Sequence, residues 1–332
     1  MNPPAFPTFN DWIAARPRWH GWLQLSQERA YAHAEENYDQ QYGVVAPEPE
    51  DGEGLCSLIK THGIDTSGPA LEIGYGTGRL TYGLVRHYPG PDLLITDPSP
   101  TFLRLTQGHL GDPSQHSTRA QYAVLNADDL GQLPTGMFSL IAMRSTLHHI
   151  LKVEEFIAAC AHTLRPGGAL AMGAEPSETG YILMAAVAHS ILPTLRAAGV
   201  EIRPEWEQQL QGFTDTVKFY CRRDIDKAKA EDKHLFQPQE MAETGYKYGL
   251  QLRYFPNAAF ADYAPPYVPE FVGFENFFMN YLRYCMQFDL AFLRLIRRHL
   301  KPQFRYFDEC YRSHVGPAIT GVFLLKKTGN PA

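Results

Sequence analysis

Apolar and polar positions follow one another along this chain in an order that predicts strands separated by helices. Short, nearly continuous apolar runs predict strands at residues 69–74, 92–97, 120–125, 138–144 and 168–174. Helical or turn segments lie between each pair of runs. This alternation favours a right-handed, doubly wound parallel sheet, in which buried strands are connected by helices on both faces.

The pattern changes after Glu175 and Pro176, which end the fifth predicted strand. Residues 178–200 predict one helix, and little strand signal follows until about residue 247. Residues 235–257 predict a helix, a glycine turn and a strand, and residues 319–327 predict a last strand. The second half of the chain therefore adds two strands and long helical segments to the first five units.

The segment before the first strand is expected to be helical. Residues 9–42 carry a helical pattern, with Asn10 and Ser26 as candidate N-caps of two helices. Residues 44–54, VVAPEPEDGEG, are rich in Pro, Glu and Gly and predict a loop.

Aromatic residues are concentrated between the last two predicted strands. Residues 254–311 contain seventeen of the 37 Phe and Tyr residues of the chain. Six of them recur at three- and four-residue steps and form one helical face: Phe274, Phe277, Phe278, Tyr281, Tyr284 and Phe288. This face either packs onto the sheet or a dimer partner, or forms a cap whose rings line a substrate pocket. Ligands enter at the carboxyl ends of parallel strands, and insertions after strands five and six can close over that edge, which favours a cap.

Composition narrows the classes of partner. The 332 residues carry a net charge of −6 without a cluster of Lys and Arg, which argues against nucleic acid as the main partner. The five cysteines form no C-x-x-C pair, which favours free thiols in a reducing compartment. The start of the chain does not resemble a signal peptide, and no apolar stretch reaches the roughly 18 residues of a membrane span. We therefore expect a cytoplasmic protein without a membrane partner.

The most informative motif lies at residues 70–80, ALEIGYGTGRL. The apolar end of a predicted strand is followed by Gly74, Gly76 and Gly78, and Leu80 opens a predicted helix. Such a turn lets a ligand approach the backbone and the N–H groups of a helix N-terminus. A dinucleotide-binding G-x-G-x-x-G motif would place glycine at position 79, but this residue is Arg79, and the pattern is E-x-G-x-G-x-G.

This motif resembles motif I of the class I S-adenosylmethionine (SAM)-dependent methyltransferases, and the resemblance extends in order over residues 69–176. Weaker similarity at 235–257 and 319–327 brings the resemblance to about two-fifths of the chain. It implies a Rossmann-like α/β fold, with a doubly wound, seven-stranded, mostly parallel sheet and an antiparallel last strand. It also implies an N-terminal helical lid, to which we add an inserted aromatic helical cap. The expected organisation is a lid at 1–45, a SAM-binding core at 46–180, a helical insertion at 181–234, the sixth-strand region at 235–257, the aromatic cap at 258–317 and the last strand and tail at 318–332.

The resemblance also implies which residues bind SAM. Glu72 matches the acid linked to the methionine amino group, and Asp97 matches the acid that accepts from the ribose hydroxyls. Asn126 stands where the family often has Asp beside the adenine, and its amide oxygen can still accept a hydrogen bond. The full set is Glu72, Gly74, Tyr75, Gly76, Gly78, Asp97, Pro98, Ser99, Asn126, Ala127, Arg144 and Ser145, with Tyr38 and Tyr42 from the lid.

The catalytic candidates follow the fourth predicted strand. His148 and His149 match a Leu-His-His run near the transferring methyl group, and Arg144 precedes them. Either imidazole is a candidate base because histidine titrates near neutral pH, although the family often uses this pair for packing; a Tyr of the cap is the alternative base. Candidates for substrate binding are Tyr254, Tyr281, Arg283 and Tyr284. Paired carboxylates for a catalytic Mg²⁺ are not evident, so the sequence predicts no metal.

The resulting hypothesis is O-, N- or C-methylation of a small molecule, for example in secondary metabolism, by a monomer or homodimer. One alternative is attack at the aminocarboxypropyl carbon of SAM, by cyclisation or transfer, with release of methylthioadenosine. The other is a non-catalytic partner protein with the same fold. That alternative requires a damaged ligand loop, whereas Glu72, the three glycines and Asp97 are all intact.

Overall fold

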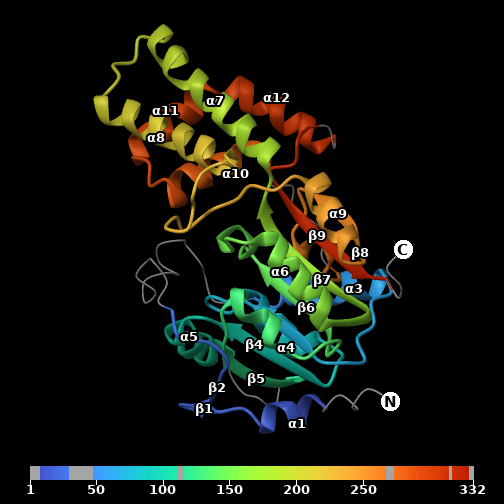
Figure 1. Ribbon diagram of the computed structural model, residues 1–332. Coiled ribbons are helices and arrows are strands. Elements are labelled where there is room, and N and C mark those ends of the chain that lie inside the picture. Colours follow the sequence, from blue (N-terminus) through green and yellow to red (C-terminus); the bar gives the residue numbers. More distant parts are fainter. Residues whose placement is uncertain (1–7, 30–47, 111–115, 267–272, 314–315, 329–332) are drawn as a thin grey trace.

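A nine-stranded sheet forms the centre of the molecule in the computed structural model, which describes residues 8–29, 48–110, 116–266, 273–313 and 316–328. The strand order is β1-β2-β5-β4-β3-β6-β7-β9-β8 (Figure 1). The strands are β1 (Arg18–Trp19), β2 (Trp22–Gln24), β3 (Ala70–Ile73), β4 (Asp92–Asp97), β5 (Arg119–Val124), β6 (Phe138–Arg144), β7 (Leu164–Pro176), β8 (Leu250–Pro256) and β9 (Thr320–Lys327).

The predicted seven-stranded, doubly wound sheet is confirmed. From β5 to β8 the sheet contains the seven expected strands, and the chain progresses outward from β3 in both directions. Strands β3 to β7 pair in parallel, whereas β9 is antiparallel to both of its neighbours, β7 and β8. The order of the strands reverses at β3, with β4 on one side and β6 on the other. The carboxyl ends of β3, β4 and β6 therefore lie together at one edge of the sheet, where ligands of such sheets bind.

Helices cover both faces of this sheet. Apolar side chains of α1 (Phe9–Ala14), α6 (Val153–Thr163) and α9 (Pro238–Lys247) pack on one face. Those of α3 (Glu50–Thr61), α4 (Arg79–His87) and α5 (Pro100–Leu110) pack on the other. Because both faces are buried, the central strands are continuously apolar, which is why the sequence pattern located them.

The N-terminal prediction needs correction. Thr8, not Asn10, caps α1, and its hydroxyl accepts from the backbone N–H of Asp11. Ser26 caps no helix; it follows β2, and its hydroxyl accepts from the backbone N–H of Asn126. The chain forms β1 and β2 within the region predicted to be helical, because β2 finds a parallel partner in β5. The lid residues Tyr38 and Tyr42 lie outside the described residues.

The predicted loop at 44–54 is also partly wrong, since α3 begins at Glu50. Gly52 and Gly54 lie inside this helix at two close contacts. A Cβ on Gly52 would collide with the backbone of α4, and one on Gly54 would collide with the carbonyl of Phe260. These glycines therefore permit packing between helices and do not mark a turn.

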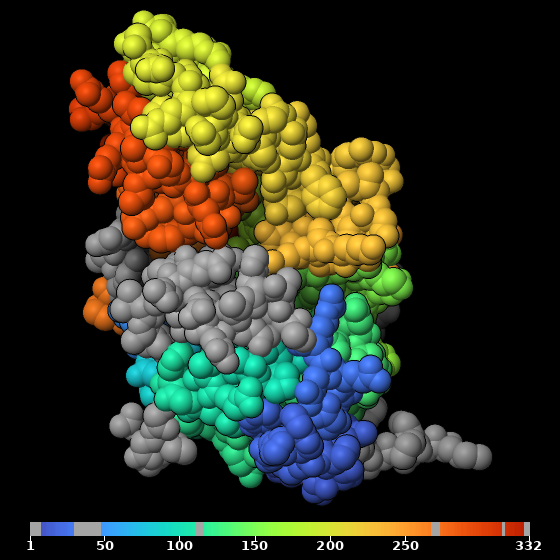
Figure 2. Space-filling view, turned by 90° about the vertical axis from the view of Figure 1, so that its left-hand side faces the viewer, coloured from blue at the N-terminus to red at the C-terminus, as the bar shows by residue number. Residues whose placement is uncertain are grey.

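A helical cap rises from the edge of the sheet and is built from two separate insertions (Figures 1 and 2). The first contributes α7 (Glu178–Ala197) and α8 (Pro204–Cys221), between β7 and α9. The second contributes α10 (Phe274–Asn280), the π-helical turn η6 (Tyr281–Cys285), α11 (Leu290–His299) and α12 (Lys301–Arg312), between β8 and β9. All of these elements share one hydrophobic cluster that is separate from the two clusters of the sheet.

The aromatic face of the second insertion mainly fills this cap core. Phe274, Phe278 and Phe288 are buried against helices of the cap and do not pack onto the sheet. Stacking between α8 and α11 adds to the same core, where the rings of Trp206 and Phe292 are parallel with centroids 4.7 Å apart. The cap is thus a packed helical unit of its own.

No described helix is both long and apolar enough to cross a membrane. The five cysteines form no disulfide.

Candidate active site

The glycine turn after β3 holds its three glycines in the left-handed region, with φ of 66° at Gly74, 54° at Gly76 and 91° at Gly78. A Cβ on Gly74 would press on the side chain of Thr146, and one on Gly78 would lie 2.8 Å from Thr106 Cγ2. A Cβ on Gly76 would meet nothing within 4 Å. Space is therefore open in front of Gly76, where a ligand can approach the backbone.

Glu72, the acid near the end of β3, is 1% exposed. Its Oε1 accepts a 2.9 Å hydrogen bond from Thr81 Oγ1, whereas Oε2 has no partner among the described residues. Burial raises the pKa of Glu72 to about 8, and the charge of Asp97 adds to this shift. A buried carboxylate oxygen without a partner is suited to an ammonium group, which would supply both a hydrogen bond and a counter-charge.

Asp97, at the end of β4, faces the same turn. Its Oδ2 accepts from the backbone N–H of Gly76 at 3.2 Å, and its Oδ1 accepts from the backbone N–H of Ser99 at 2.9 Å. On the neighbouring strand end, the amide nitrogen of Asn126 donates to the carbonyl of Gln27 at 2.9 Å. The structure thus joins Asp97 to the glycine turn, and the amide of Asn126 contacts the segment that follows β2.

The turn after β6, η4 (Leu147–His149), is organised by a residue that the sequence did not single out. The fully buried carboxylate of Glu175, on β7, accepts from the backbone N–H groups of Thr146, Leu147 and His148 at 2.8, 2.9 and 3.2 Å. The same carboxylate lies 2.8 Å from Nδ1 of His148. Glu175 therefore sets both the backbone of the turn and the orientation of its first imidazole.

The pKa values of His148 and Glu175 shift in opposite directions. Burial acts to lower the pKa of His148, but the adjacent Glu175 carboxylate raises it overall. Burial acts to raise the pKa of Glu175, but His148 and the backbone donors lower it overall. Burial, with the nearby charge of His148, lowers the pKa of His149 to about 4. The two adjacent histidines are therefore electrostatically distinct.

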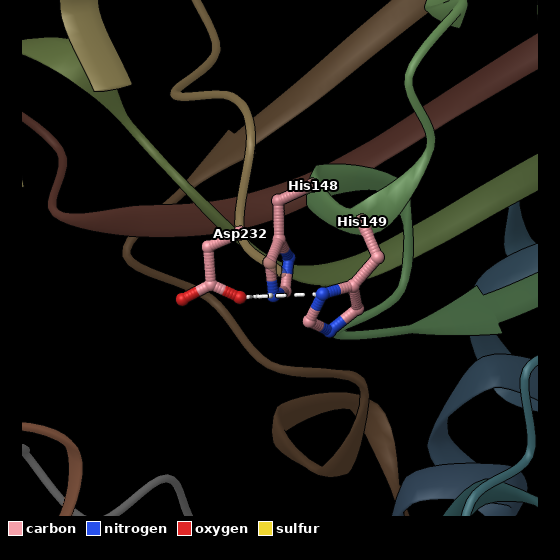
Figure 3. Close-up of side chains that lie close together, drawn as sticks. All are labelled: His148, His149 and Asp232. Atoms are coloured by element: carbon pink, nitrogen blue, oxygen red, sulfur yellow. Dashed lines mark ion pairs between the residues drawn. The ribbon is translucent and has the colours of Figure 1, made fainter. Parts of the chain in front are cut away.

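Asp232 joins the two histidines from a distant part of the chain (Figure 3). One oxygen, Oδ1, lies 3.2 Å from Nδ1 of His149 and 3.6 Å from Nε2 of His148. The other, Oδ2, accepts a 3.1 Å hydrogen bond from the hydroxyl of Tyr220. Asp232 lies in the segment between α8 and α9, and the backbone N–H of Lys233 donates to the carbonyl of His148 at 2.8 Å.

Arg144 is held by an ion pair that the sequence also did not reveal. Nε of Arg144 and Nε of Arg79 each lie 2.9 Å from Oδ2 of Asp51, whose side chain is 4% exposed. Asp51 belongs to the first turn of α3, within the segment predicted to be a loop. An acidic residue in an apparent loop carries no signal for such a contact, since the pairing depends on how α3 packs on α4.

A cavity of about 980 Å³ lies between the sheet and the cap. The sheet side contributes Arg144, Ser145 and both histidines, and the cap contributes Tyr281 and Phe277. Glu72, the three glycines and Asp97 are not among its lining residues. The cavity therefore extends from the histidine turn toward the cap, next to the glycine turn.

Three of the four predicted substrate-binding residues do not line this cavity. Tyr254 packs in the core instead, with its ring centroid 4.6 Å from that of Phe323. The exposed Arg283 places its guanidinium 4.8 Å from the ring centroid of Tyr284. Tyr281 is the predicted residue that the structure places in the cavity wall. The helical spacing identified the aromatic face, of which Phe277 and Tyr281 line the cavity and Tyr284 does not.

Comparisons with known proteins agree with this fold. Residues 71–170 match the model of a methyltransferase domain family. The ubiquinone biosynthesis O-methyltransferases of Xanthomonas oryzae and Homo sapiens are 29% and 26% identical over 100 residues, which are 30% of this chain. These residues span 40% and 27% of the two relatives. The biotin biosynthesis bifunctional protein BioCD of Bordetella avium is 30% identical over 155 residues, 46% of this chain and 30% of that protein.

Among solved structures, phosphoethanolamine N-methyltransferase 2 of Haemonchus contortus, in complex with S-adenosyl-L-methionine, is 12% identical with a TM-score of 0.47. The match covers 89% of this chain and 57% of that one.

Proposed function

We propose that this chain, which carries a class I SAM-dependent methyltransferase domain, transfers a methyl group from SAM to a small-molecule acceptor bound in the cavity under the cap. The observation that carries the proposal is the position of the cavity. Its walls join the histidine turn at the edge of the parallel strands to a cap with its own core. An acceptor in this space would lie beside the cofactor and away from bulk water.

The residues at the glycine turn fit the cofactor. Oε2 of Glu72, which has no partner among the described residues, suits the ammonium group of the methionine part, and the open space before Gly76 suits close approach of the ligand. Asp97, at the adjacent strand end, suits the ribose hydroxyls, each charged hydrogen bond contributing about 1.5–3 kcal/mol. SAM supplies a methyl group that its sulfonium has already activated.

The chain's own residues then have two tasks. The cap and the histidine turn align the acceptor and exclude water, since an in-line displacement depends mainly on the alignment of the reacting atoms. His148 and His149 are our candidates for the group that takes a proton from an acceptor hydroxyl or amine. Glu175 holds His148 in place, and Asp51 holds Arg144 at the cavity wall.

Product analysis tests the proposal. Purified protein is incubated with SAM alone and with SAM plus a metabolite extract, and the products are identified by mass spectrometry. We expect S-adenosylhomocysteine only when extract is present, together with a methylated product that identifies the acceptor. Methylthioadenosine from SAM alone would instead establish attack at the aminocarboxypropyl carbon and overturn methyl transfer.

Two substitutions test the cofactor site. Asp97→Ala removes the carboxylate at the strand end and should weaken SAM binding at least tenfold, which calorimetry can measure. Gly76→Val fills the open space before the turn and should have a similar effect. Gly136→Val is the matched control, because a Cβ there also meets nothing within 4 Å and its backbone φ of 63° is positive like that of Gly76. Unchanged affinity in both site variants would contradict the proposed cofactor site.

A further inference from the structure

We propose that His148, His149 and Asp232 form a binding site for one divalent transition-metal ion at the wall of the cavity. One ligand atom from each residue lies within 4.8 Å of the others. Figure 3 shows the two ring nitrogens converging on Oδ1 of Asp232. The separations of 3.2 and 3.6 Å from this oxygen are close to those between neighbouring ligands of a metal whose bonds are about 2.0–2.2 Å long.

Two of the three ligands are oriented by a further contact, as is common around bound metals. His148 donates from Nδ1 to the buried carboxylate of Glu175, which directs Nε2 toward Asp232. The hydroxyl of Tyr220 holds the other oxygen of Asp232. A carboxylate behind a histidine ligand and a donor behind a carboxylate ligand both favour one fixed ligand geometry.

The segment that carries Asp232 is itself anchored. Nζ of Lys227 donates to the carbonyls of Tyr220 and Lys233 at 2.8 and 2.7 Å, and the backbone N–H of Lys233 donates to the carbonyl of His148. The side chain of Lys227 is 4% exposed. These contacts hold Asp232 at the histidine turn although it is more than eighty residues away in sequence.

The ligand set selects the class of ion. Two imidazoles and one carboxylate suit Zn²⁺, Fe²⁺, Co²⁺ or Mn²⁺, whereas Mg²⁺ and Ca²⁺ prefer oxygen ligands. Three protein ligands leave coordination positions open, and all three residues line the cavity. Nδ1 of His149 lies 3.2 Å from the carbonyl of Glu231, so metal binding at Nδ1 requires the neutral tautomer with its proton on Nε2 and gives up this contact.

The consequence for catalysis rests on the proposed function: with the ion bound, neither imidazole can take the acceptor's proton, and an open position would instead bind the acceptor through oxygen, so acceptors with a hydroxyl or carboxylate are favoured. Metal binding itself requires no methyl transfer. A failure of the metal site and a failure of the proposed function therefore give different results.

Titration of the full chain with Co²⁺ tests the site. Protein is first dialysed against a chelator, and Co²⁺ binding is followed through visible d–d absorption and through competition by Zn²⁺. We expect one equivalent per chain, without a thiolate charge-transfer band. A strong band of that kind would indicate ligation by cavity-lining Cys285 and would overturn the proposed ligand set.

Substitutions distinguish binding of Co²⁺ at this cluster from binding elsewhere in the cavity. Asp232→Ala should weaken Co²⁺ binding at least tenfold, and Tyr220→Phe should weaken it by a smaller factor. Asp215→Ala is the matched control, because Asp215 also lines the cavity but is paired with Lys218 outside the cluster. Should Asp232→Ala fail to fold by circular dichroism, His149→Gln serves in its place. Equal Co²⁺ affinity in the wild type and the ligand variants, or an equal loss in Asp215→Ala, would refute the site.

Discussion

Glu72 combines burial with a carboxylate oxygen that has no partner among the described residues, and this combination makes ligand binding depend on pH. A bound ammonium group favours the charged carboxylate, whereas the free protein favours the neutral one because of desolvation. If the ammonium group of SAM binds at this carboxylate, as we propose, its binding releases a proton at neutral pH.

We expect the affinity for SAM to rise as the pH increases from about 6 toward 8, by up to tenfold per pH unit, because the pKa of Glu72 is about 8. The increase should end near pH 8, where the α-amino group of SAM loses its own proton. Calorimetry across this range, in buffers with different ionisation enthalpies, measures both the affinity and the released proton. Glu72→Gln should bind SAM weakly at every pH, and a pH dependence that persists in this variant would contradict the assignment.

The same shift affects stability. The unfolded chain loses the Glu72 proton near the ordinary value of 4.5, whereas the folded protein keeps it to about 8. The contribution of this group to the free energy of unfolding is therefore present at low pH and is lost as the pH rises from 4.5 to 8.

At the scale of elements, packing between α3 and α4 positions the ion pair of Asp51 with the two arginines. The helices approach at Gly52 and Gly83, where a Cβ on either residue would collide with backbone atoms of the other helix or of the segment before it. Side chains at this crossing would separate the helices and move Asp51 away from Arg144.

Gly83→Ala should destabilise the protein by about 1–3 kcal/mol, because the added methyl group cannot be accommodated without moving α3. Gly108→Ala is the matched control: it lies in α5, has nothing within 4 Å of its Cβ, and should be neutral or stabilising by up to about 1 kcal/mol. Urea unfolding measures both. A Gly83→Ala protein as stable as the Gly108→Ala protein would contradict the close contact.

The elements also show what a sequence can predict. The central strands and the glycine turn were located correctly because their signals are local: a continuous apolar run, and glycines with positive φ before a helix. The start of α3 was missed because Gly52 and Gly54 allow close packing, whereas glycines in a Pro- and Glu-rich segment usually indicate a loop. Strands β1 and β2 are too short for a periodic pattern.

The sequence could predict only those residues of the candidate site that lie in recognisable segments. Glu72 and Asp97 end strands in recognisable segments, so their proximity follows from the order of the sheet. Glu175 and Asp232 meet the histidine turn through tertiary structure, from the end of another strand and from an insertion. No spacing in the sequence relates either of them to His148, so the sequence carries no sign that an acidic residue lies beside the two histidines.

At the scale of the whole molecule, the cap and the sheet have separate hydrophobic cores. Damage to the cap core should therefore affect the cavity more than the cofactor site. Phe292 is fully buried in the cap and stacks on Trp206, so it tests this independence well.

Phe292→Ala should cost the cap about 3–5 kcal/mol and increase amide hydrogen exchange in α7, α8 and α10 to α12, while β3 to β7 stay protected. Hydrogen exchange read by mass spectrometry resolves the two regions. Tyr306→Ala is the control, because this aromatic residue of α12 is 67% exposed. Equal loss of protection in the sheet would show instead that the molecule unfolds as one cooperative unit.

The division of the cap between two insertions has a consequence for the order of synthesis. Strands β3 to β7 and the glycine turn leave the ribosome before any part of the second insertion exists. The apolar faces of α7 and α8 remain without their packing partners until α10, α11 and α12 are made, and these helices come after β8 in the chain. A nascent chain can therefore assemble the parallel strands of its central sheet early, but it closes the cavity only after the second insertion has been synthesised. Any product that ends before α10 would expose the unpaired faces of α7 and α8 to water and to other chains.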